Sequence, residues 1–422
     1  MTTWFDGLLD RAIRPGPLLA GVVVGFAACA WLGHAVGATN RFKNFERFTV
    51  HTDPQSNYQP SANQVRSLMR ESVRRDQIAV VVAGDSVLFG SGQGREGVWT
   101  KRLQEELGDR YRVINLALPG LHPQEFGTVA AEMLYRDGHQ RVIVLTHNWI
   151  SPIGALGAPD GRPLSRWFFW DAFSRRRLLD DPARAAQLAP AAAPGEEALD
   201  PVLREQIRKD REQREEVQRQ TTLDRWLNFR DLWNGFEYEY GVTVWCKVMG
   251  ETWYQPRKSY PDPDPVHPAA TPAVLEVAKV HIVQNYQPQI ATLRPVVRRP
   301  SGEVLAPGEL GGPFPIEESL RNVFPAPIRE RMIVVATHFH PQFLEALTPD
   351  DRTTWDALGP AMVAIYARTG VTVFEACKGY PYDAYFDYAH MTVAGGRRLA
   401  ADLAPAVRRL AAKLGYLEET NP

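Results

Sequence analysis

Short apolar runs rich in β-branched residues alternate with helical patterns in two parts of the chain, and this alternation restricts the possible folds most strongly. Five runs read as strands: 78–83, 113–118, 141–146, 332–337 and 371–375. Four segments read as helices: 98–107, 124–135, 351–368 and 393–414. Such alternation favours a parallel sheet with helices on both faces. We therefore predict an α/β fold with three layers, in which sites lie beyond the carboxyl ends of the strands.

The segment from 151 to 325 interrupts this alternation. It is rich in aromatic residues and prolines, and it contains a predicted charged helix, Pro201–Leu232. We interpret the charge run Arg204–Arg219 in this helix as a solvated face. We predict a large, mostly helical insertion that covers the site. The catalytic domain is then formed by residues 77–150 and 326–418, after a polar linker at 39–76.

The N-terminal part, residues 1–38, contains an apolar run of 21 residues from Leu18 to Ala38. At 1.5 Å per residue a helix of this length reaches about 30 Å, the thickness of a bilayer core. A cleaved signal peptide is the competing interpretation, because Ala27, Ala28 and Cys29 are small. The apolar part of a signal peptide usually has only about 7–15 residues. We therefore predict an uncleaved single-pass anchor; basic residues on both flanks leave its orientation undecided.

Small residues recur at every fourth position inside this run, at Gly21, Gly25, Cys29, Gly33 and Gly37. Such spacing forms a groove on one face of a membrane helix and lets a second helix approach closely. The alternative is that glycine is simply common in membrane helices. We predict that the anchor packs against another membrane helix, either its own copy or that of a partner.

Charge and cysteine content exclude some other kinds of site. The formal net charge is −1, so no long-range field favours nucleic acid. The three cysteines, Cys29, Cys246 and Cys377, lack the spacing of a metal site. We expect no nucleic-acid partner, no metal and no cofactor.

Ser86 is the candidate nucleophile. It ends the sequence Val81-Val82-Ala83-Gly84-Asp85-Ser86, where a predicted strand meets the start of a helix. Such a turn exposes the hydroxyl, and Gly84 tolerates backbone dihedrals that other residues avoid. Gly-Asp-Ser alone is a weak motif, but its position at a strand end favours a catalytic role.

A serine hydroxyl needs a base, and the base needs an orienting carboxylate. Asp387 and His390 supply both within one turn, after the last predicted strand and before the closing helix. A second Asp-x-x-His sequence, at Asp264 and His267, lies in a proline-rich stretch without a predicted strand. We predict a catalytic triad of Ser86, Asp387 and His390.

Three hydrogen-bond donors follow predicted strands and form a candidate oxyanion hole: the Ser86 amide, the Gly120 amide and the Asn148 side chain. Gly120 has an alternative role as a turn glycine, and Asn148 as a strand-end cap. His147, His338 and His340 also lie at strand ends. We interpret these histidines as structural rather than as pocket residues, and the pair at 338 and 340 lacks a third metal ligand.

Four blocks of this chain resemble the SGNH, or GDSL-type, hydrolases in order and spacing. They are Gly84-Asp85-Ser86, Asn115–Gly120, Thr146-His147-Asn148 and Asp387–His390. The resemblance covers residues 77–155 and 328–415 and implies a flavodoxin-like sheet. The third block usually reads Gly-x-Asn-Asp, and here Thr146 and Trp149 replace the glycine and the aspartate.

The N-terminal helix, the insertion and Pro349-Asp350-Asp351-Arg352 resemble the envelope acyl-transfer branch of that family. This branch includes D-alanyl transfer proteins of teichoic-acid alanylation and alginate O-acetylation proteins. The resemblance implies a catalytic domain outside the cytoplasmic membrane and a membrane-bound O-acyltransferase as partner. It implies O-acyl transfer to a cell-envelope glycopolymer. Hydrolysis of a lipid or acylated sugar, and a non-catalytic envelope scaffold, are the alternatives.

Overall fold

Five parallel strands form one sheet in the order β2-β1-β3-β4-β5. They are β1 (Ile78–Val82), β2 (Tyr111–Asn115), β3 (Val142–Trp149), β4 (Met332–Thr337) and β5 (Thr372–Ala376). The chain first adds β2 on one side of β1 and then crosses to β3 on the other side. The predicted parallel α/β sheet is therefore confirmed. In sheets of this order, ligands bind at the carboxyl ends of the strands where the direction of winding reverses, here between β1 and β3.

The computed structural model describes residues 15–37, 62–118, 126–149, 266–285, 287, 290, 294, 297–299, 301–305 and 326–417. The chain divides into two units, one formed by 1–43, 51–68 and 179–258 and the other by 44–50, 69–178 and 259–422. The sheet lies in the second unit. Most of the predicted insertion, including Pro201–Leu232, lies outside the described residues, so its helical character and the domain boundaries remain predictions.

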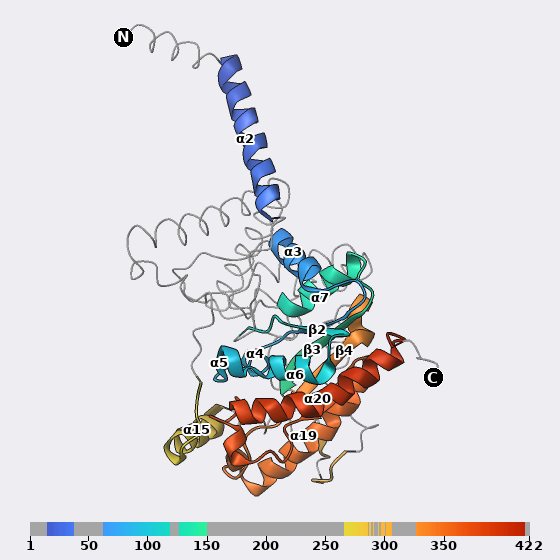
Figure 1. Cartoon of the computed structure of the whole chain (residues 1–422). Helices are drawn as coiled ribbons and strands as arrows, with labels where there is room; N and C mark the ends of the chain where they lie inside the picture. Colours follow the sequence, from blue (N-terminus) through green and yellow to red (C-terminus); the bar gives the residue numbers. More distant parts are fainter. Residues whose placement is uncertain are drawn as a thin grey trace, which may run out of the picture. The chain divides into compact units, whose positions relative to one another are not determined.

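In the second unit, helices connect the strands and pack against the sheet (Figure 1). The α-helices are α2 (Pro15–Gly37), α3 (Ala62–Ser72), α4 (Ser86–Phe89), α5 (Gly94–Gly97), α6 (Trp99–Leu107), α7 (Phe126–Arg136), α15 (Pro272–Asn285), α18 (Pro341–Leu344), α19 (Pro349–Arg368) and α20 (Val393–Lys413). Two short 3-10 helices, η4 (Ala326–Arg331) and η5 (Tyr382–Ala384), precede β4 and follow β5.

The central strand β1 is buried along its whole length. Ile78, Val80 and Val82 join a core cluster with side chains from α6 and α20. Ala79 and Val81 point to the other side, because strand side chains alternate, and they are also fully buried. Both faces of β1 are therefore covered, as expected for a parallel strand with a continuous apolar sequence.

Two strand boundaries differ from those expected from the sequence. β2 begins at Tyr111 and ends at Asn115, whereas the apolar pattern suggested 113–118. Pairing with β1 decides this boundary, because Ile78 lies opposite Tyr111 and Val82 opposite Asn115. β3 extends to Trp149 because β4 continues to pair with it as far as Thr337. Asn148 therefore lies within a strand and not after it.

The N-terminal helix α2 is long and apolar enough to cross a membrane over Pro15–Ala35, 21 residues with a mean hydropathy of 1.8. Large apolar side chains on it are exposed, including Leu19, Val24 and Trp31. A helix that is apolar all round is typical of a membrane span. A signal sequence near the N-terminus can also meet these limits of length and composition.

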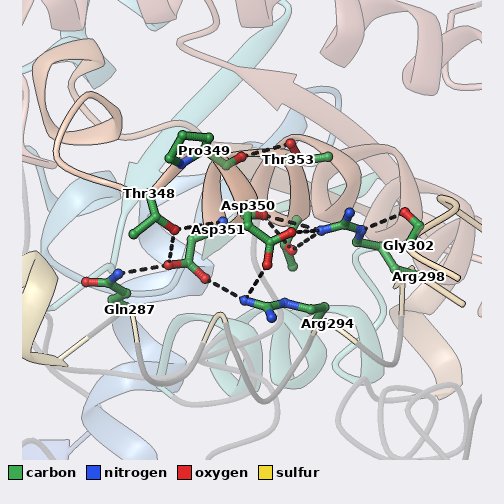
Figure 2. A network of polar contacts seen from close by, with 10 residues as sticks. Gln287, Arg294, Arg298, Gly302, Thr348, Pro349, Asp350, Asp351 and Thr353 are labelled. Carbon is green, nitrogen blue, oxygen red and sulfur yellow. Dashed lines mark hydrogen bonds and ion pairs between the residues drawn. The ribbon is translucent and has the colours of Figure 1, made fainter. Parts of the chain in front are cut away.

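A polar network connects residues near the end of the predicted insertion with the start of α19 (Figure 2). Thr348 caps this helix by accepting a hydrogen bond from the Asp351 amide at 3.2 Å, and its hydroxyl donates to the Asp351 carboxylate at 2.6 Å. Gln287 and Arg294 also donate to this carboxylate, at 2.8 and 3.0 Å. Burial alone would raise the pKa of Asp351, but the three donors Thr348, Gln287 and Arg294, together with the Arg294 charge, lower it below its usual value.

Replacing Asp351 by asparagine is expected to lower the free energy of unfolding by about 2 kcal/mol at pH 7, because charged hydrogen bonds are lost. A carboxyl with a lowered native pKa stabilises the fold above its unfolded pKa, near 3.9, and this contribution is lost as pH falls below that value. The difference between wild type and Asp351→Asn should therefore shrink between pH 6 and pH 3. Urea unfolding at both pH values measures it.

Asp356→Asn on the same helix is the matched control. Asp356 pairs with Arg352 in an exposed ion pair, and such pairs contribute only about 0–1 kcal/mol. An equal loss of stability in the two variants, or a difference that does not depend on pH, would contradict the role assigned to Asp351.

Candidate active site

Ser86 lies in a sharp turn at the carboxyl end of β1. Gly84 has φ of 95°, a conformation that favours glycine. A Cβ at Gly84 would also lie only 2.9 Å from the backbone nitrogen of His147 in β3. Asp85 then caps α4, which begins at Ser86 and ends at Gly90 in a left-handed conformation. Glycine is thus required where the turn touches β3, and Ser86 becomes the first residue of a one-turn helix.

His390 contacts this serine although the two residues are 304 positions apart. Its Nε2 atom lies 2.7 Å from Ser86 Oγ. Its Nδ1 atom lies 2.7 Å from Asp387 Oδ2. The Asp387 Oδ1 atom accepts hydrogen bonds from the amides of Ala389 and His390 at 2.8 and 2.7 Å. The structure therefore brings together the three residues predicted as a triad.

The electrostatics of Asp387 suit an orienting carboxylate. Burial by itself would raise its pKa, but the hydrogen bond and charge of His390 and the two amide donors outweigh burial and lower it. An ionised carboxylate only accepts hydrogen bonds, so the His390 proton resides on Nδ1. Nε2 is then free of a proton and accepts from the Ser86 hydroxyl. This arrangement can activate Ser86 as a nucleophile.

The loop that carries Asp387 and His390 is folded back on itself after β5. Cys377 has φ of 67°, a conformation uncommon for residues other than glycine, and turns the chain away from the sheet. The buried Tyr385 hydroxyl donates to the Cys377 carbonyl at 3.2 Å. The Phe386 amide donates to the His390 carbonyl at 3.1 Å. These contacts close the loop around the acid and the base.

The first turn of helix α20 supports this loop. Thr392 caps the helix by accepting from the Gly395 amide at 3.3 Å, and its own amide donates to the Ala384 carbonyl at 2.9 Å. A Cβ at Gly395 would overlap the Ala384 carbonyl oxygen. Glycine at 395 therefore lets the loop rest directly on the helix, a role that the position of Gly395-Gly396 in sequence did not reveal.

The segment Val266–Ala270, which the sequence pattern left aside, is part of the site. The His267 amide donates to the Gly92 carbonyl at 2.7 Å, and the Ala270 amide donates to the Tyr385 carbonyl at 2.9 Å. The His267 ring stacks on Phe386 at 4.7 Å, and Phe386 stacks on His390 at 5.5 Å between ring centroids. The sequence predicted no strand for this proline-rich stretch, and its described residues, from Val266 on, form none; an isolated bridge and single backbone hydrogen bonds hold them instead. Asp264 lies outside the described residues. The sequence showed no strand pattern here, because isolated backbone hydrogen bonds, and not a strand, hold the segment in place.

Replacing Gly92 by alanine is expected to lower the rate at which Ser86 reacts with a fluorophosphonate by about 10- to 100-fold, because small displacements of catalytic groups have effects of this size. Gly92 has φ of 81°, and a Cβ there would overlap the ring of Phe386. The ring must shift, and with it the stack on His390. The measurement is the second-order rate constant of labelling.

Gly108→Ala separates this effect from backbone strain. Gly108 has nearly the same φ, 79°, but an added Cβ meets no atom within 4 Å there. Both variants should lose about 1–3 kcal/mol of stability, because alanine is strained at a positive φ and Gly108, with ψ of −177°, lies in a region almost confined to glycine. Equal labelling rates in the two variants would show that the Phe386 position does not matter.

The other histidines at strand ends have partners. His147 is buried, with Nδ1 2.7 Å from Asp85 Oδ2 and Nε2 2.6 Å from Thr337 Oγ1. His338 Nε2 lies 2.7 Å from Glu375 Oε1. The fully buried His340 stacks on Tyr382 at 5.0 Å. Among the described residues, no group of three or more His, Cys, Asp or Glu side chains is placed to hold a metal ion. The sequence did not reveal that His147 pairs with Asp85.

Of the three predicted oxyanion-hole donors, Ser86 and Asn148 have described backbones, and Gly120 lies outside the described residues. The backbone of Asn148 lies in β3, opposite Ala336 in β4. The Ser86 amide occupies the first position of α4, where an amide has no partner within the helix. The role of all three as oxyanion donors remains a prediction.

No protein-family model and no curated protein matches this chain. The resemblance to SGNH hydrolases therefore depends on the four sequence blocks. Two of these blocks, Gly84–Ser86 and Asp387–His390, are described completely and lie in hydrogen-bond contact with each other.

Proposed function

We propose that this protein is a membrane-anchored serine acyltransferase of the SGNH type that acts on a cell-envelope polysaccharide or glycopolymer. The observation that carries this proposal is the hydrogen-bonded chain from Asp387 through His390 to Ser86, with both contacts at 2.7 Å. A carboxylate, an imidazole and a hydroxyl in this order are the means by which serine enzymes form acyl intermediates.

In the first step, Ser86 Oγ attacks the carbonyl carbon of an acyl ester while His390 Nε2 takes the hydroxyl proton. The tetrahedral intermediate carries a negative oxygen, for which the amides of Ser86 and Gly120 and the Asn148 side chain are the proposed donors. The intermediate then breaks its bond to the leaving alcohol, which receives the proton from His390. The acyl group remains as an ester on Ser86.

In the second step, an acceptor hydroxyl gives its proton to His390 Nε2 and attacks the acyl carbon. The bond to Ser86 Oγ breaks, and the serine regains its proton from His390. Asp387 stays ionised throughout and stabilises the imidazolium that forms in each step. A sugar hydroxyl as acceptor gives acyl transfer of an acetyl or D-alanyl type group, and water gives ester hydrolysis.

The remaining architecture is part of the same proposal. The sheet and its helices would form the three-layer SGNH arrangement, with the segment 151–325 as a helical cover over the site. Helix α2 supports an anchoring role, because its exposed apolar side chains suit a bilayer. We propose that it holds the catalytic domain on the outer side of the cytoplasmic membrane, beside a membrane-bound O-acyltransferase that supplies acyl groups.

The test uses the full chain in detergent micelles or lipid nanodiscs. A fluorophosphonate is expected to label the protein in a one-to-one ratio, and peptide mapping should place the label on Ser86. Absence of label at Ser86 under saturating probe would contradict the proposal and favour a non-catalytic scaffold.

A second arm separates transfer from hydrolysis, because both use the same residues. The protein is incubated with 4-nitrophenyl acetate, with and without an uncharged oligosaccharide as acceptor. Transfer predicts acetylated oligosaccharide and faster release of 4-nitrophenol when the acceptor is present. Free acetate as the only acyl product, with a rate of 4-nitrophenol release that does not depend on the acceptor, identifies an esterase.

A further inference from the structure

A second hydrogen-bonded series of carboxylate, imidazole and hydroxyl begins at Asp85, the residue before the candidate nucleophile Ser86. Asp85 Oδ2 lies 2.7 Å from His147 Nδ1, and His147 Nε2 lies 2.6 Å from Thr337 Oγ1. The three residues come from the ends of three adjacent segments: the turn after β1, the strand β3 and the last residue of β4. The order of groups is the same as in Asp387, His390 and Ser86.

The two hydrogen-bonded series of side chains differ in how deeply they are buried. The side chain of His147 is 1% exposed, and Thr337 is 1% exposed overall. A hydroxyl at this depth does not reach a substrate, so Thr337 is no second nucleophile. Buried polar groups require partners, and this chain satisfies both nitrogens of the His147 ring.

The carboxylate of Asp85 connects the two residues on either side of Ser86. Asp85 precedes the serine, and its Oδ1 atom accepts a hydrogen bond from the Val87 amide at 2.9 Å. Its Oδ2 atom is fastened to β3 through His147. The Asp85 side chain therefore connects the turn in which Ser86 lies to β3.

The direction of the hydrogen bonds follows from the chemistry of the groups. Burial by itself would raise the pKa of Asp85, but the charge and hydrogen bond of His147 and the Val87 amide lower it, so the carboxylate is ionised. It accepts from both donors, and the proton of a neutral His147 ring is on Nδ1. Nε2 then accepts from the Thr337 hydroxyl. Without that hydroxyl, a buried ring nitrogen would lose its donor.

We propose that Asp85, His147 and Thr337 are positioning residues that hold the Ser86 turn in register with His390. These hydrogen bonds link the turn to β3, which pairs with β1, and to β4, which pairs with β3, on the side of β1 where the winding direction reverses. This inference rests on the proposed function, because its consequence is the reactivity of Ser86.

Thr337→Val tests the inference, because valine keeps the shape of threonine and removes only the hydroxyl. The labelling of the full-length protein by a fluorophosphonate is measured as an inactivation rate constant and a binding constant. Thr337→Val should lower the inactivation rate constant by about 10- to 100-fold and leave the binding constant unchanged. Thr337→Ser keeps the hydroxyl and should restore the wild-type rate to within about threefold, a difference of about 0.7 kcal/mol.

Asp85→Ser is the second variant, in case Thr337→Val does not fold. Serine is also a favoured helix cap and can still accept from the Val87 amide, but it is too short to reach His147. The same loss in the inactivation rate constant is expected. The buried Nδ1 proton of His147 also loses its acceptor, which lowers the melting temperature, so the rate constant is measured at a temperature at which the variant is fully folded.

Three outcomes are distinguishable. Wild-type rates in either folded variant would overturn the inference, and so would losses of labelling that only follow losses of melting temperature. Failure of the wild-type protein to react at Ser86 would instead contradict the proposed function.

Discussion

Replacing Ser86 by alanine is expected to lower kcat for ester cleavage by about 10⁶-fold, the size of effect seen when a serine nucleophile is removed. The reason is the contact between Ser86 Oγ and His390 Nε2 at 2.7 Å, which leaves the base with nothing to activate once the hydroxyl is gone. Labelling by a fluorophosphonate should disappear as well. The melting temperature should stay at the wild-type value, because only one oxygen atom is removed from a half-buried side chain.

Ser301→Ala is the matched control. It is the same substitution in an exposed turn of the described residues, and wild-type kcat is expected.

The double variant Ser86→Ala/His390→Ala is a more stringent test of whether His390 acts through Ser86, because residues of a triad act as a unit. It should be no slower than Ser86→Ala alone. A further large loss in the double variant would mean that His390 activates something other than Ser86.

Replacing Asp387 by asparagine is expected to lower kcat by about 10⁴-fold while the fold is kept. The Asp387 carboxylate accepts the Nδ1 proton of His390 at 2.7 Å. The amide group of asparagine can donate to Nδ1, which favours the tautomer with the proton on Nε2. That proton then points at Ser86 Oγ, so the base can no longer accept from the hydroxyl.

Asp383→Asn is the control for this substitution. Asp383 lies four residues earlier on the same loop, and its side chain is exposed. Activity close to that of the wild type is expected, with steady-state hydrolysis of 4-nitrophenyl acetate as the measurement. A loss of less than about tenfold in Asp387→Asn would mean that the hydrogen bond to His390 does not select the tautomer.

Local sequence patterns were sufficient to predict much of the fold and to single out the three residues of the candidate triad. Val80, Val81 and Val82 predict a buried strand because their β-branched side chains suit a pleated surface, and Gly84 marks the turn that follows. The order of strands and helices along the chain predicts a parallel sheet, and parallel strands bring their carboxyl ends to one edge. Ser86, Asp387 and His390 each follow a strand, so their convergence was predictable without knowing the strand order.

Some contacts depend on the tertiary structure, because no local periodicity in the sequence encodes them. The pairing of Ile78 with Tyr111 sets where β2 begins, and the pairing of Trp149 with Thr337 sets where β3 ends. His267 reaches the site through single backbone bonds, which leave no repeating pattern in the sequence.

The pairing of Asp85 with His147 shows the same limit. Both residues lie at strand ends, but their contact requires β3 to lie beside β1, which depends on how the chain crosses over the sheet and packs its helices. Periodicity and turn chemistry are local, so the amino-acid sequence predicts which residues lie at the edge of the sheet where the strands end. Which of these residues touch depends on the packing of the whole sheet, because the contacts join residues 62, 190 or 304 positions apart.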